Sequence, residues 1–351
     1  MIRIRDVAKL AQVSEAAVSR VLNGDASFSA SEQTRKRIFD AASELGYQPS
    51  RPRKFKTNDS KRTFNVGLLL TTSQEDEVND PYYLSIRLGI EKQCNALGIA
   101  LKSTLRISQS LTSAAFSDLD GLIIVGSIDP KSLRQIYFEN DNLVFVNNML
   151  RHDPDFDAVL SDLAEATEAC IDILTDLGHR SIGFIGGIEM ILNVATLEST
   201  AEPDIRHQAY ESKMRQLGLY LEEHVYIGNW TAADGQRMAN EAIARGELPT
   251  AFLVGSDPLS MGVVHAFREA GIRVPEDVSI ISFDDIEAAA FMNPPLSSVR
   301  MFSEEIGRQA VRTLHDRLMG RQVVINIVVP SKLTVRQSYS SPRKEAMKRI
   351  P

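Results

Sequence analysis

Residues 13–24 read VSEAAVSRVLNG, and this stretch decides how the first part of the chain folds. Ser14 occupies the position of a helix N-cap, and apolar residues recur at helical spacing after it. A helix of about nine residues is too short to be stable alone in water, so it must pack against neighbours. Its opposite face carries small, polar and basic groups, which indicates that this face is available to a partner. The apolar positions are Ala17, Val18, Val21 and Leu22.

Two further short helices flank this stretch. The first covers residues 4–11 and is joined to the helix after Ser14 by a tight turn at Gln12 and Val13. The third runs over residues 31–45, and Gly46 ends it. We expect one small core to form from Val7, Ala8, Leu10 and Ala11 of the first helix and Ile38, Phe39, Ala42 and Leu45 of the third.

Charge is distributed unevenly along the 351 residues. Residues 1–62 hold 13 Lys/Arg and 7 Asp/Glu, a net charge of +6, whereas the whole chain has a net charge of −7. Within this basic end, QPSRPRKFKTNDSKRT (48–63) has six basic residues and two prolines and indicates a linker. A basic end on an acidic body favours binding of that end to a polyanion. A solvated basic tail is the alternative that charge alone leaves open.

Composition places the chain among globular proteins of more than one domain, with 43% hydrophobic and 24% charged residues. No apolar run approaches the roughly 18 residues that span a bilayer. The first ten residues, MIRIRDVAKL, lack the apolar segment of a signal peptide. Cys94 and Cys170 both stand in apolar helical patterns, which indicates buried free thiols in a reducing compartment. We therefore expect a cytoplasmic protein without a membrane segment.

From residue 64 onward, short apolar strands alternate with amphipathic helices. This alternation is typical of doubly wound parallel sheets, and about 280 residues are enough for two such lobes. Ligands of doubly wound sheets bind beyond the carboxyl ends of the strands. Several of these ends are polar, which suits a hydroxyl-rich ligand, although each polar pair taken alone is better explained as a loop cap. The expected strands are 65–72, 121–127, 143–148, 181–187, 251–257 and 279–285, and the expected helices are 82–97, 163–177, 205–217, 232–245, 258–270 and 303–319.

Two short helices with a tight turn, the second bearing arginine, are typical of a helix-turn-helix. The segment IRIRDVAKLAQVSEAAVSRVLNG (2–24) closely resembles the head of the lactose/galactose repressor (LacI/GalR) family. LTDLGHRSIGFIGG (174–187), residues 252–285 and NPPLSSVRM (293–301) resemble signatures of that family's core, so that the likeness covers essentially the whole chain. The segments DIRHQAY, NPPLSSVRM and VVPSKLTVRQS resemble members that control the use of β-galactosides.

The resemblance implies a fold and a mechanism. The expected fold is a small all-α helix-turn-helix domain plus an α/β core like the periplasmic sugar-binding proteins, with two doubly wound parallel sheets. The expected domains are 1–46 for the helix-turn-helix, 47–62 for a hinge, 63–341 for the two-lobed core and 342–351 for a short tail. The family binds a palindromic operator in double-stranded DNA as a dimer, and a sugar between the lobes changes the affinity for DNA. The tail has no leucine heptads, so we expect a homodimer rather than a tetramer.

On the helix that follows Ser14, the resemblance assigns operator reading to Glu15 and Ala16. Glu15 can accept from a cytosine amino group and Ala16 can contact a thymine methyl, although a helix N-terminus favours an acid in any case. Arg20 matches an arginine that binds guanine O6 and N7, with a phosphate contact as the alternative. The phosphate-contacting positions that the resemblance implies are Ser14, Ser19 and Asn23. Many members have glycine at position 12, so Gln12 must tolerate a strained turn.

The linker departs from the family pattern. Members form a hinge helix whose leucine inserts into the minor groove, and Phe55 stands at that position between basic residues that include Arg51 and Arg53. Pro52 is compatible with the first turn of such a helix but not with its interior. We expect a short hinge helix that orders on operator DNA. The alternative is an unfolded basic linker whose Phe55 packs on the core.

The resemblance also assigns the effector site. Arg206 would donate to paired sugar hydroxyls, and Asp284 would accept from them. Trp230, the only tryptophan, stands where members place an aromatic residue in the cleft, with core packing as the alternative. The remaining matched positions are Tyr82, Tyr83, Asn147, Ser256 and Asp257, whereas Asp285 is expected to be structural. Galactose or a β-galactoside is the expected effector, and a non-sugar effector or an activator remains the alternative.

The alternatives to a DNA-binding regulator are an enzyme and a sugar-binding protein that does not contact DNA. A glycosidase needs two carboxylates about 5–9 Å apart across a sugar, and only Asp257 and Asp284 qualify at the expected cleft. No Cys/His metal cluster, GxSxG motif or P-loop is present in the sequence, so we expect no metal, no cofactor and no enzyme. A sugar-binding protein without DNA contact would lack the helix-turn-helix.

The lone aromatic residue of the basic linker generates a prediction. If Phe55 inserts into the minor groove at the operator centre, Phe55→Ala weakens operator binding more than binding to unrelated DNA, because phosphate contacts serve both but the inserted ring serves only the bent operator. Both affinities are measured by titration at matched salt. An equal fall in the two affinities contradicts the insertion.

Overall fold

The computed structural model describes residues 4–22, 30–45, 47, 63–107, 111–137, 140–148 and 155–343. The chain forms two compact units, with the boundary after the N-terminal segment between Arg62 and Thr63. Each unit is described by itself below. Over the described residues, no helix has both the length and the apolar character needed to cross a membrane.

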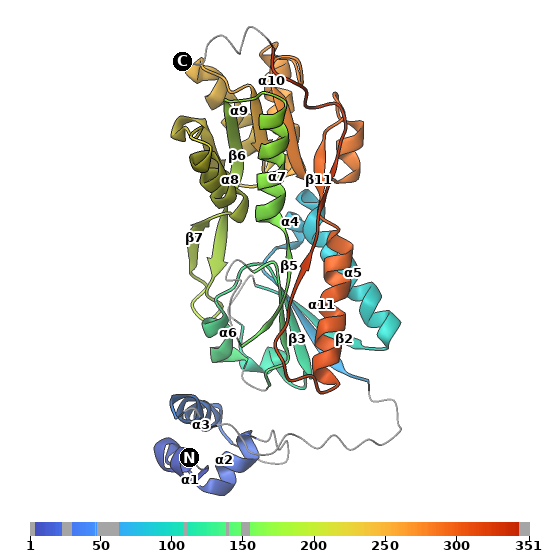
Figure 1. Cartoon of the computed structure of the whole chain (residues 1–351). Helices are drawn as coiled ribbons and strands as arrows, with labels where there is room; N and C mark the ends of the chain where they lie inside the picture. The colour runs from blue at the N-terminus through green and yellow to red at the C-terminus, as the bar shows by residue number, and fades with distance from the viewer. Residues whose placement is uncertain are drawn as a thin grey trace. The chain divides into compact units, whose positions relative to one another are not determined.

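The N-terminal unit consists of three short helices, drawn in dark blue in Figure 1. They are α1 (Ile4–Ala11), α2 (Glu15–Leu22) and α3 (Glu32–Glu44). Their shared core contains Val7, Ala8, Ala11, Val18, Val21, Ile38, Ala41 and Ala42. The expected inward position of Leu10 is wrong, because its side chain is 44% exposed. On α3, Ala41 is buried in this core, although the sequence analysis did not place it there.

A strained turn joins α1 to α2. The N–H of Val13 donates to the carbonyl of Ala8 (3.0 Å), which ends α1 in the manner of a Schellman motif. Gln12 adopts φ 54°, the left-handed conformation that favours glycine, at a cost of about 1–2 kcal/mol. Ser14 then starts α2 by accepting from the N–H of Ala17 (3.1 Å). The strain at Gln12 and the cap at Ser14, both expected from the sequence, are therefore present.

The first lobe of the core is a parallel sheet of six strands in the order β12-β5-β4-β3-β1-β2. Helices α5 and α11 pack together and cover its inner strands, which are apolar because both faces are buried. The lobe contains β1 (Asn65–Leu70), α4 (Gln74–Asn79), α5 (Pro81–Leu97), β2 (Ala100–Arg106), η1 (Ser113–Phe116), β3 (Gly121–Val125), α6 (Pro130–Ile136), β4 (Leu143–Val146), β5 (Asp157–Ser161), α11 (Ser303–Leu318) and β12 (Asn326–Val329).

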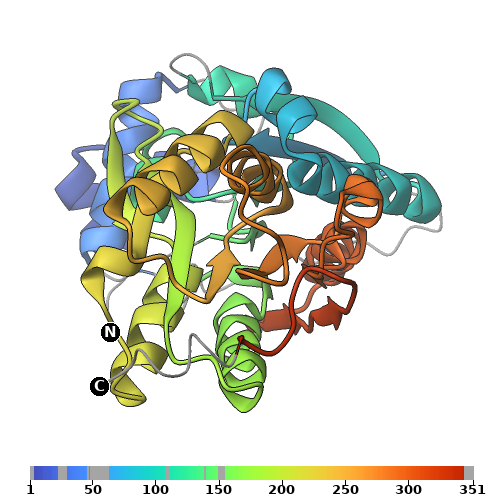
Figure 2. The same ribbon diagram turned by 90° about the horizontal axis from the view of Figure 1, so that it is seen from above.

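The second lobe is built on a seven-stranded sheet with parallel inner strands and two antiparallel pairings, β6 with β7 and β11 with β13. Helices α9 and α10 cover one face, and α7 and α8 cover the other, as Figure 2 shows from above. The lobe contains α7 (Leu163–Asp176), β6 (Ile182–Leu192), β7 (Ser199–Pro203), α8 (Ile205–Gln216), η2 (Glu222–His224), β8 (Val225–Gly228), α9 (Ala232–Arg245), β9 (Ala251–Val254), α10 (Asp257–Glu269), β10 (Ser279–Asp284), η3 (Glu287–Phe291), β11 (Ser298–Arg300) and β13 (Lys332–Thr334).

The expected α/β core with two doubly wound sheets is confirmed, and each expected strand and helix coincides with an observed one. The sequence did not reveal β2, β5, β7, β8, β11, β12 and β13. Several of these have no continuous apolar run: β2 reads ALKSTLR at the edge of its sheet, β7 is exposed along its whole length, and β11 has only three residues. In contrast, β5, β8 and β12 contain short apolar runs that the sequence analysis missed. Cys94 and Cys170 are buried free thiols, as expected, and burial raises the pKa of the Cys170 thiol to about 12.

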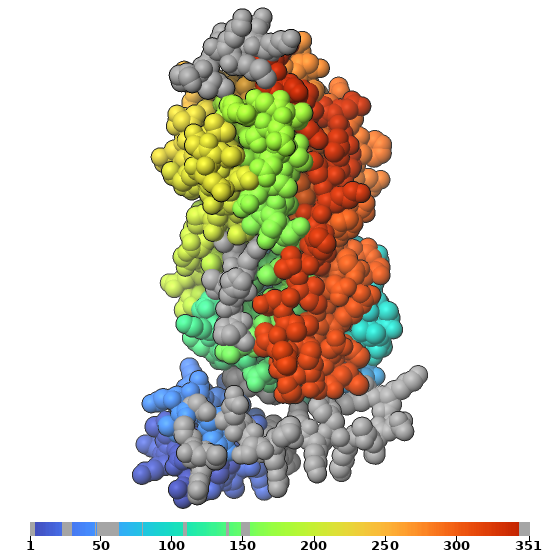
Figure 3. Space-filling model, viewed as in Figure 1, coloured from blue at the N-terminus to red at the C-terminus, as the bar shows by residue number. Residues whose placement is uncertain are grey.

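The chain crosses between the lobes three times, after β5, after β11 and after β12. The carboxylate of Asp162, in the first crossing, accepts from the N–H of Ser331 in the third (2.9 Å). In the second crossing, Phe302 adopts φ 47° just before α11 begins. Figure 3 shows the C-terminal segment, in red and orange, running continuously over both lobes along this face.

A buried carboxylate fastens the C-terminal segment to the first lobe. Asp157, at the start of β5, has no exposed surface. It accepts from Arg317 (2.7 and 3.1 Å), from Arg321 (2.7 and 3.0 Å) and from the N–H of Ile325 (2.8 Å). Burial by itself raises the pKa of Asp157, but the hydrogen bonds from Arg321, Arg317 and Ile325 outweigh it and lower the pKa below its ordinary value.

Asp157→Asn should therefore lower the free energy of unfolding by about 3–5 kcal/mol, because it leaves two guanidinium groups without their buried partner. In the wild type this stabilisation is complete above the ordinary carboxyl pKa and is lost as the pH falls through the lower pKa of the folded state. Urea unfolding at several pH values measures both effects. Asp118→Asn is the control, because that side chain is 83% exposed and pairs only with Lys102. Equal unfolding midpoints for the two variants would contradict the prediction that Asp157 stabilises the first lobe.

Candidate functional site

The first part of the candidate site is the outer face of α2. Ala17, Val18 and Val21 hold the helix in the small core, while Ser14, Glu15, Ala16 and Arg20 are exposed and Ser19 is partly exposed. The Ser14 oxygen is occupied as an acceptor by the N–H of Ala17, and its O–H group is suited to donate to a phosphate. Short side chains at the start of the helix allow its backbone to approach a base edge closely.

The structure thus brings five of the expected DNA-contacting residues to one helix. The other expected residues, Asn23, Arg51, Arg53 and Phe55, lie outside the described residues. Their assignment stays a prediction.

The second part of the site is a buried guanidinium in the core. Arg206, at the start of α8, is held by Asp204, which accepts from Nε (2.7 Å) and from Nη2 (3.0 Å). Its Nη1 donates to the carbonyl of Gly255 (2.5 Å). Burial lowers the pKa of the guanidinium, but the adjacent Asp204 and the charge of Asp284 raise it by more, so that Arg206 is permanently charged. Three of its five N–H groups are therefore oriented by the second lobe before any ligand binds.

Trp230 packs directly on this guanidinium. The Cζ atom of Arg206 lies 4.4 Å from the centre of the Trp230 ring, a cation–π contact. The indole N–H donates to the carbonyl of Ile188 (3.0 Å), and Gly187 and Gly255 leave room for the ring because a Cβ at either glycine would meet it at 2.3 or 3.0 Å. Trp230 is thus fixed beside Arg206 and supports the guanidinium. It also packs on the core of the second lobe and does not line the cavity, so its role as a cleft aromatic stays a prediction.

Asp284 ends β10 in an unusual backbone conformation. Its φ is 101° and that of the following Asp285 is 53°, both in the left-handed region that costs L-residues energy. Burial raises the pKa of Asp284 well above its ordinary value, the charges of Asp80 and Asp257 raise it further, and Arg206 opposes them. Its Oδ2 atom is buried and has no hydrogen-bond partner among the described residues. A ligand hydroxyl that donates a hydrogen bond to this oxygen would provide the missing partner.

The first lobe contributes a hydroxyl and amide network. The Tyr82 hydroxyl contacts the Ser161 Oγ (3.1 Å) and accepts from the Asn147 side-chain amide. Asn147, with φ 51°, in turn accepts from the N–H and Oγ of Ser161 (both 3.1 Å). Burial raises the pKa of Tyr82, and the nearby charge of Asp284 adds to this effect, so Tyr82 stays a neutral hydroxyl. The two expected residues Tyr82 and Asn147 are thus brought together.

Tyr83 and Asp80 stand beside this network at the start of α5. The Tyr83 ring meets that of Tyr82 edge-to-face at 5.4 Å, and Asp80 caps the helix by accepting from the N–H of Tyr82 (3.0 Å). Burial raises the pKa of both Asp80 and Tyr83, while the charge of Arg206 lowers each. Arg206 of the second lobe is therefore close enough to act electrostatically on side chains of the first lobe.

Ser256 and Asp257, also expected to contact the effector, lie inside the second lobe. Ser256 is buried and caps α10 by accepting from the N–H of Leu259 (3.3 Å). Asp257 has no exposed surface and accepts from the N–H of Ile286 (2.8 Å) and the Oγ of Ser298 (2.7 Å). Burial raises the pKa of Asp257 to about 6. Both residues position the polar strand ends and are not brought to the cavity.

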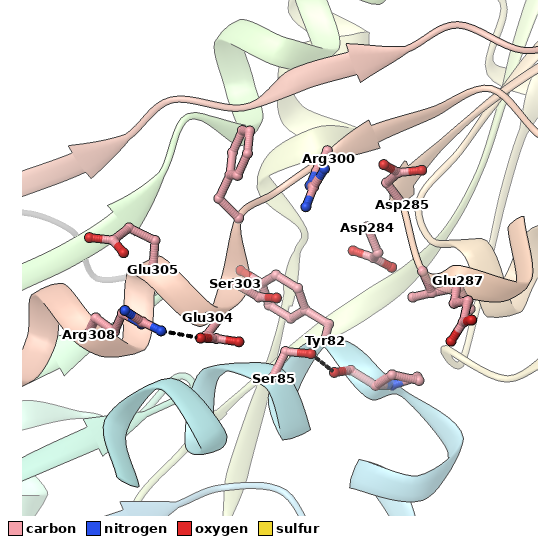
Figure 4. A pocket seen from close by; sticks show the side chains of 13 residues that line it. Tyr82, Ser85, Asp284, Asp285, Glu287, Arg300, Ser303, Glu304, Glu305 and Arg308 are labelled. Carbon is pink, nitrogen blue, oxygen red and sulfur yellow. Dashed lines mark hydrogen bonds and ion pairs between the residues drawn. The ribbon is translucent and has the colours of Figure 1, made fainter. Parts of the chain in front are cut away.

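A cavity of about 580 Å³ opens between the lobes on the side of the second crossing. Tyr82 and Ser85 line it from the first lobe and Asp284 from the second, with Arg300 and Ser303 from the crossing (Figure 4). The volume falls in the range that binds small molecules. Asp285, on the same rim, pairs with Arg336 (2.6 Å) and accepts from Thr334 (2.8 Å), which agrees with its expected structural role.

Three residues that contact or surround these side chains were not expected from the sequence: Asp80, Ser161 and Asp204. They lie outside the cavity lining, as do the expected residues Arg206, Trp230, Tyr83 and Asn147. Asp80 and Asp204 each precede a helix as an N-cap, and that signal was present in DPYY and DIRH. Ser161 carries no local signal, because only tertiary packing brings it to Tyr82 and Asn147. Among the described residues, no group of His, Cys, Asp and Glu is arranged to hold a metal ion.

The geometry defines a class of protein: a helix-turn-helix unit attached to a two-lobed binding core. Residues 3–50 match the model of bacterial regulatory proteins of the lacI family, and residues 171–339 match the periplasmic binding protein-like domain. The transcriptional repressor MelR of Bacillus subtilis is 38% identical over 98% of this chain and 99% of its own length. The regulator GalR of Streptococcus thermophilus is 32% identical over 96% and 99%, respectively.

Solved structures agree with this assignment. The complex of the transcriptional regulator CelR with cellobiose superposes with a TM-score of 0.68 at 25% identity, covering 96% of this chain and 100% of that one. The Lac repressor dimer bound to operator and an anti-inducer has the same fold, with a TM-score of 0.66 at 22% identity over 96% and 98%. The chain belongs to the lacI family, and it is a DNA-binding transcriptional regulator.

The exposed face of α2 generates a prediction. If Arg20 binds a guanine, Arg20→Ala should weaken operator binding by about 1–3 kcal/mol and relax the preference at one base pair. Titration of operators with each base at that position measures the preference. Lys36→Ala removes the same charge from an exposed position on α3 and serves as the control. A uniform loss over all sequences, as for the control, would show that Arg20 contacts a phosphate instead.

Proposed function

We propose that this regulator is a homodimeric repressor that binds a palindromic operator, and that a small sugar between the lobes of the core controls its affinity for DNA. Galactose or a β-galactoside is the proposed effector. The relative MelR is named a repressor, the CelR structure holds cellobiose, and the Lac repressor structure is a dimer on its operator. Two recognition helices of a dimer read half-sites about 34 Å apart.

The observation that carries the sugar proposal is the orphaned oxygen of Asp284 at the cavity between the lobes. An unpartnered buried acceptor costs about 1–3 kcal/mol, which a ligand hydroxyl would recover. Arg206 offers the complementary donors, since its contacts among the described residues use three of its five N–H groups. The Tyr82, Asn147 and Ser161 network adds groups that both donate and accept. A molecule rich in hydroxyls satisfies all of them together.

The first experiment titrates the purified chain into a palindromic sequence from upstream of its own or neighbouring genes, at fixed salt, with and without galactose, lactose and allied sugars. We expect one sugar to shift the operator midpoint at least tenfold. Trp230, the only tryptophan, reports binding directly through its fluorescence because the Arg206 guanidinium rests on its ring. A response to a purine and to no sugar would overturn the effector proposal and leave the regulator assignment intact.

Arg206→Lys tests the site itself. Lysine keeps the charge but loses the planar fork that Asp204 orients, so sugar affinity should fall about 10- to 100-fold. Arg215→Lys is the control, because that exposed side chain pairs with Glu211 on the outer surface of the same helix. Thermal unfolding of both variants separates a loss of binding from a loss of fold. A sugar affinity for Arg206→Lys equal to that of the control would contradict the proposed site.

A further inference from the structure

A β-hairpin bridges the two lobes independently of the three crossings. Strand β6 continues beyond the part that pairs within the second sheet and forms an antiparallel pair with β7, from Ile188↔Pro203 to Leu192↔Ser199. We call residues 188–203 the strap. In Figure 1 and Figure 2 the strap lies at the left of the core, whereas α11 and the second crossing lie at the right.

The tip of the strap is docked on the first lobe through backbone hydrogen bonds. The N–H of Leu192 donates to the carbonyl of Ser127 (3.0 Å), and the N–H of Asp129 donates to the carbonyl of Leu192 (3.0 Å). The N–H of Val194 donates to the Oγ of Ser132 (3.0 Å), at the start of α6. The strap of the second lobe therefore adds a short extra strand to the carboxyl-end edge of the first lobe.

Val194 is the buried side chain of this tip. It has no exposed surface, whereas residues 196–203 of the strap are all exposed. A side chain at the tip of such a hairpin is buried only where another part of the protein covers it. The hydrogen bond to Ser132 places that cover at α6 of the first lobe. Docking therefore removes a valine side chain from water, which stabilises the docked strap.

The base of the strap adjoins the guanidinium that is proposed to hold the sugar. At the end of the first strand, the carbonyl of Ile188 accepts from the indole N–H of Trp230 (3.0 Å), whose ring lies on Arg206. At the end of the second strand, Pro203 is followed by Asp204, which accepts from Nε and Nη2 of Arg206. Both strands of the strap thus begin or end at a residue that is in contact with this group or its partner.

The surface on which the tip docks adjoins the polar network of the first lobe. Leu192 forms its parallel bridge with Ile128, and the carbonyl of Ile128 accepts from the side-chain amide of Asn148 (2.8 Å). Asn148 follows Asn147, which belongs to the network with Tyr82. The strap therefore connects the polar groups of one lobe to those of the other.

These bonds depend on the relative pose of the lobes. The strap is the continuation of β6, whose first residues are fixed in the second sheet by pairing with β8 and β9. A rotation of one lobe against the other would carry the tip away from Ser127 and Ser132, because the strap moves with the second sheet. The strap is therefore docked in the pose in which Tyr82 and Asp284 line one cavity.

We propose that the strap is a latch, which holds the lobes in the pose that encloses the cavity and releases them when its tip undocks. This inference rests on the proposed function, because it concerns the regulation of the same cleft. A sugar that binds between the lobes favours the docked strap, and the docked strap strengthens sugar binding by the same factor. The strap is thus a two-state element that links the cleft to the pose of the lobes.

The test compares Val194→Asp with Leu197→Asp, which places the same charge on the same tip. A carboxylate at position 194 cannot be buried without a partner, so the strap should undock while the cores of both lobes stay intact. Leu197 is 36% exposed and has φ 63°, a conformation that Asp tolerates better than Leu. Val194→Asp should weaken sugar binding about tenfold or more, and Leu197→Asp should stay within about twofold of wild type. Trp230 fluorescence measures both affinities.

Operator binding without sugar gives a second readout with a defined sign. Val194→Asp disfavours the pose that the sugar favours, so it should shift operator affinity in the direction opposite to the effect of sugar on wild type. A sugar that weakens operator binding thus predicts a tighter-binding variant, and one that strengthens it predicts a weaker-binding variant. Thermal unfolding of both variants confirms that the proteins compared are folded.

Hydrogen exchange measures the docking itself in the wild type. The amides of Asp129, Leu192 and Val194 donate only across the lobes in this structure, so sugar should slow their exchange about tenfold. Equal sugar affinities for the two variants, or exchange at these amides that sugar leaves unchanged, overturns the latch while the proposed function stands. A wild type that binds no sugar overturns the proposed function and the latch with it.

Discussion

The buried guanidinium of Arg206 is the charge around which the cleft is organised. An ion of this kind is expensive to bury, and Asp204, the Gly255 carbonyl and the face of Trp230 together offset that expense. Because these partners come from α8, from the end of β9 and from the turn before α9, they tie three elements of the second lobe to one point. Asp284 and Tyr82 lie within electrostatic reach of the same guanidinium.

Beside the carboxylate of Asp80, the first lobe contributes a network of uncharged groups to this centre. Tyr82, Asn147 and Ser161 bind each other, and burial keeps the tyrosine hydroxyl protonated. One lobe therefore supplies an oriented charge and the other supplies adaptable hydroxyl and amide groups. A ligand that satisfies both sets favours one relative pose of the lobes, which is the physical basis for coupling a small molecule to a distant DNA-binding unit.

The elements that the sequence predicted well are those whose pattern is local. The helix-turn-helix follows from the spacing of Val18 and Val21 and from the cap at Ser14, and the inner strands follow from continuous apolar runs buried on both faces. The hairpin of β6 and β7 did not follow. The reason is that β7 has no apolar face, and the hairpin is positioned by backbone hydrogen bonds of Leu192 to Ser127 and Asp129, which are far away in sequence. Leu10 shows the same limit, since a helical pattern does not reveal which apolar residue its neighbours leave exposed.

The sequence by itself determined the class of the protein, because the recognition helix, the strand signatures and the basic end can be recognised from the types and spacing of the residues. Through its resemblance to the lacI family, it also indicated Arg206, Asp284 and Tyr82 as effector-binding residues. Only the tertiary structure decided that Asp257 is satisfied inside its lobe and that Tyr82, Asn147 and Ser161 form one network. The reason is that burial and hydrogen-bond partners depend on segments more than a hundred residues apart in some cases, as Arg317 and Asp157 illustrate, and no local pattern records them.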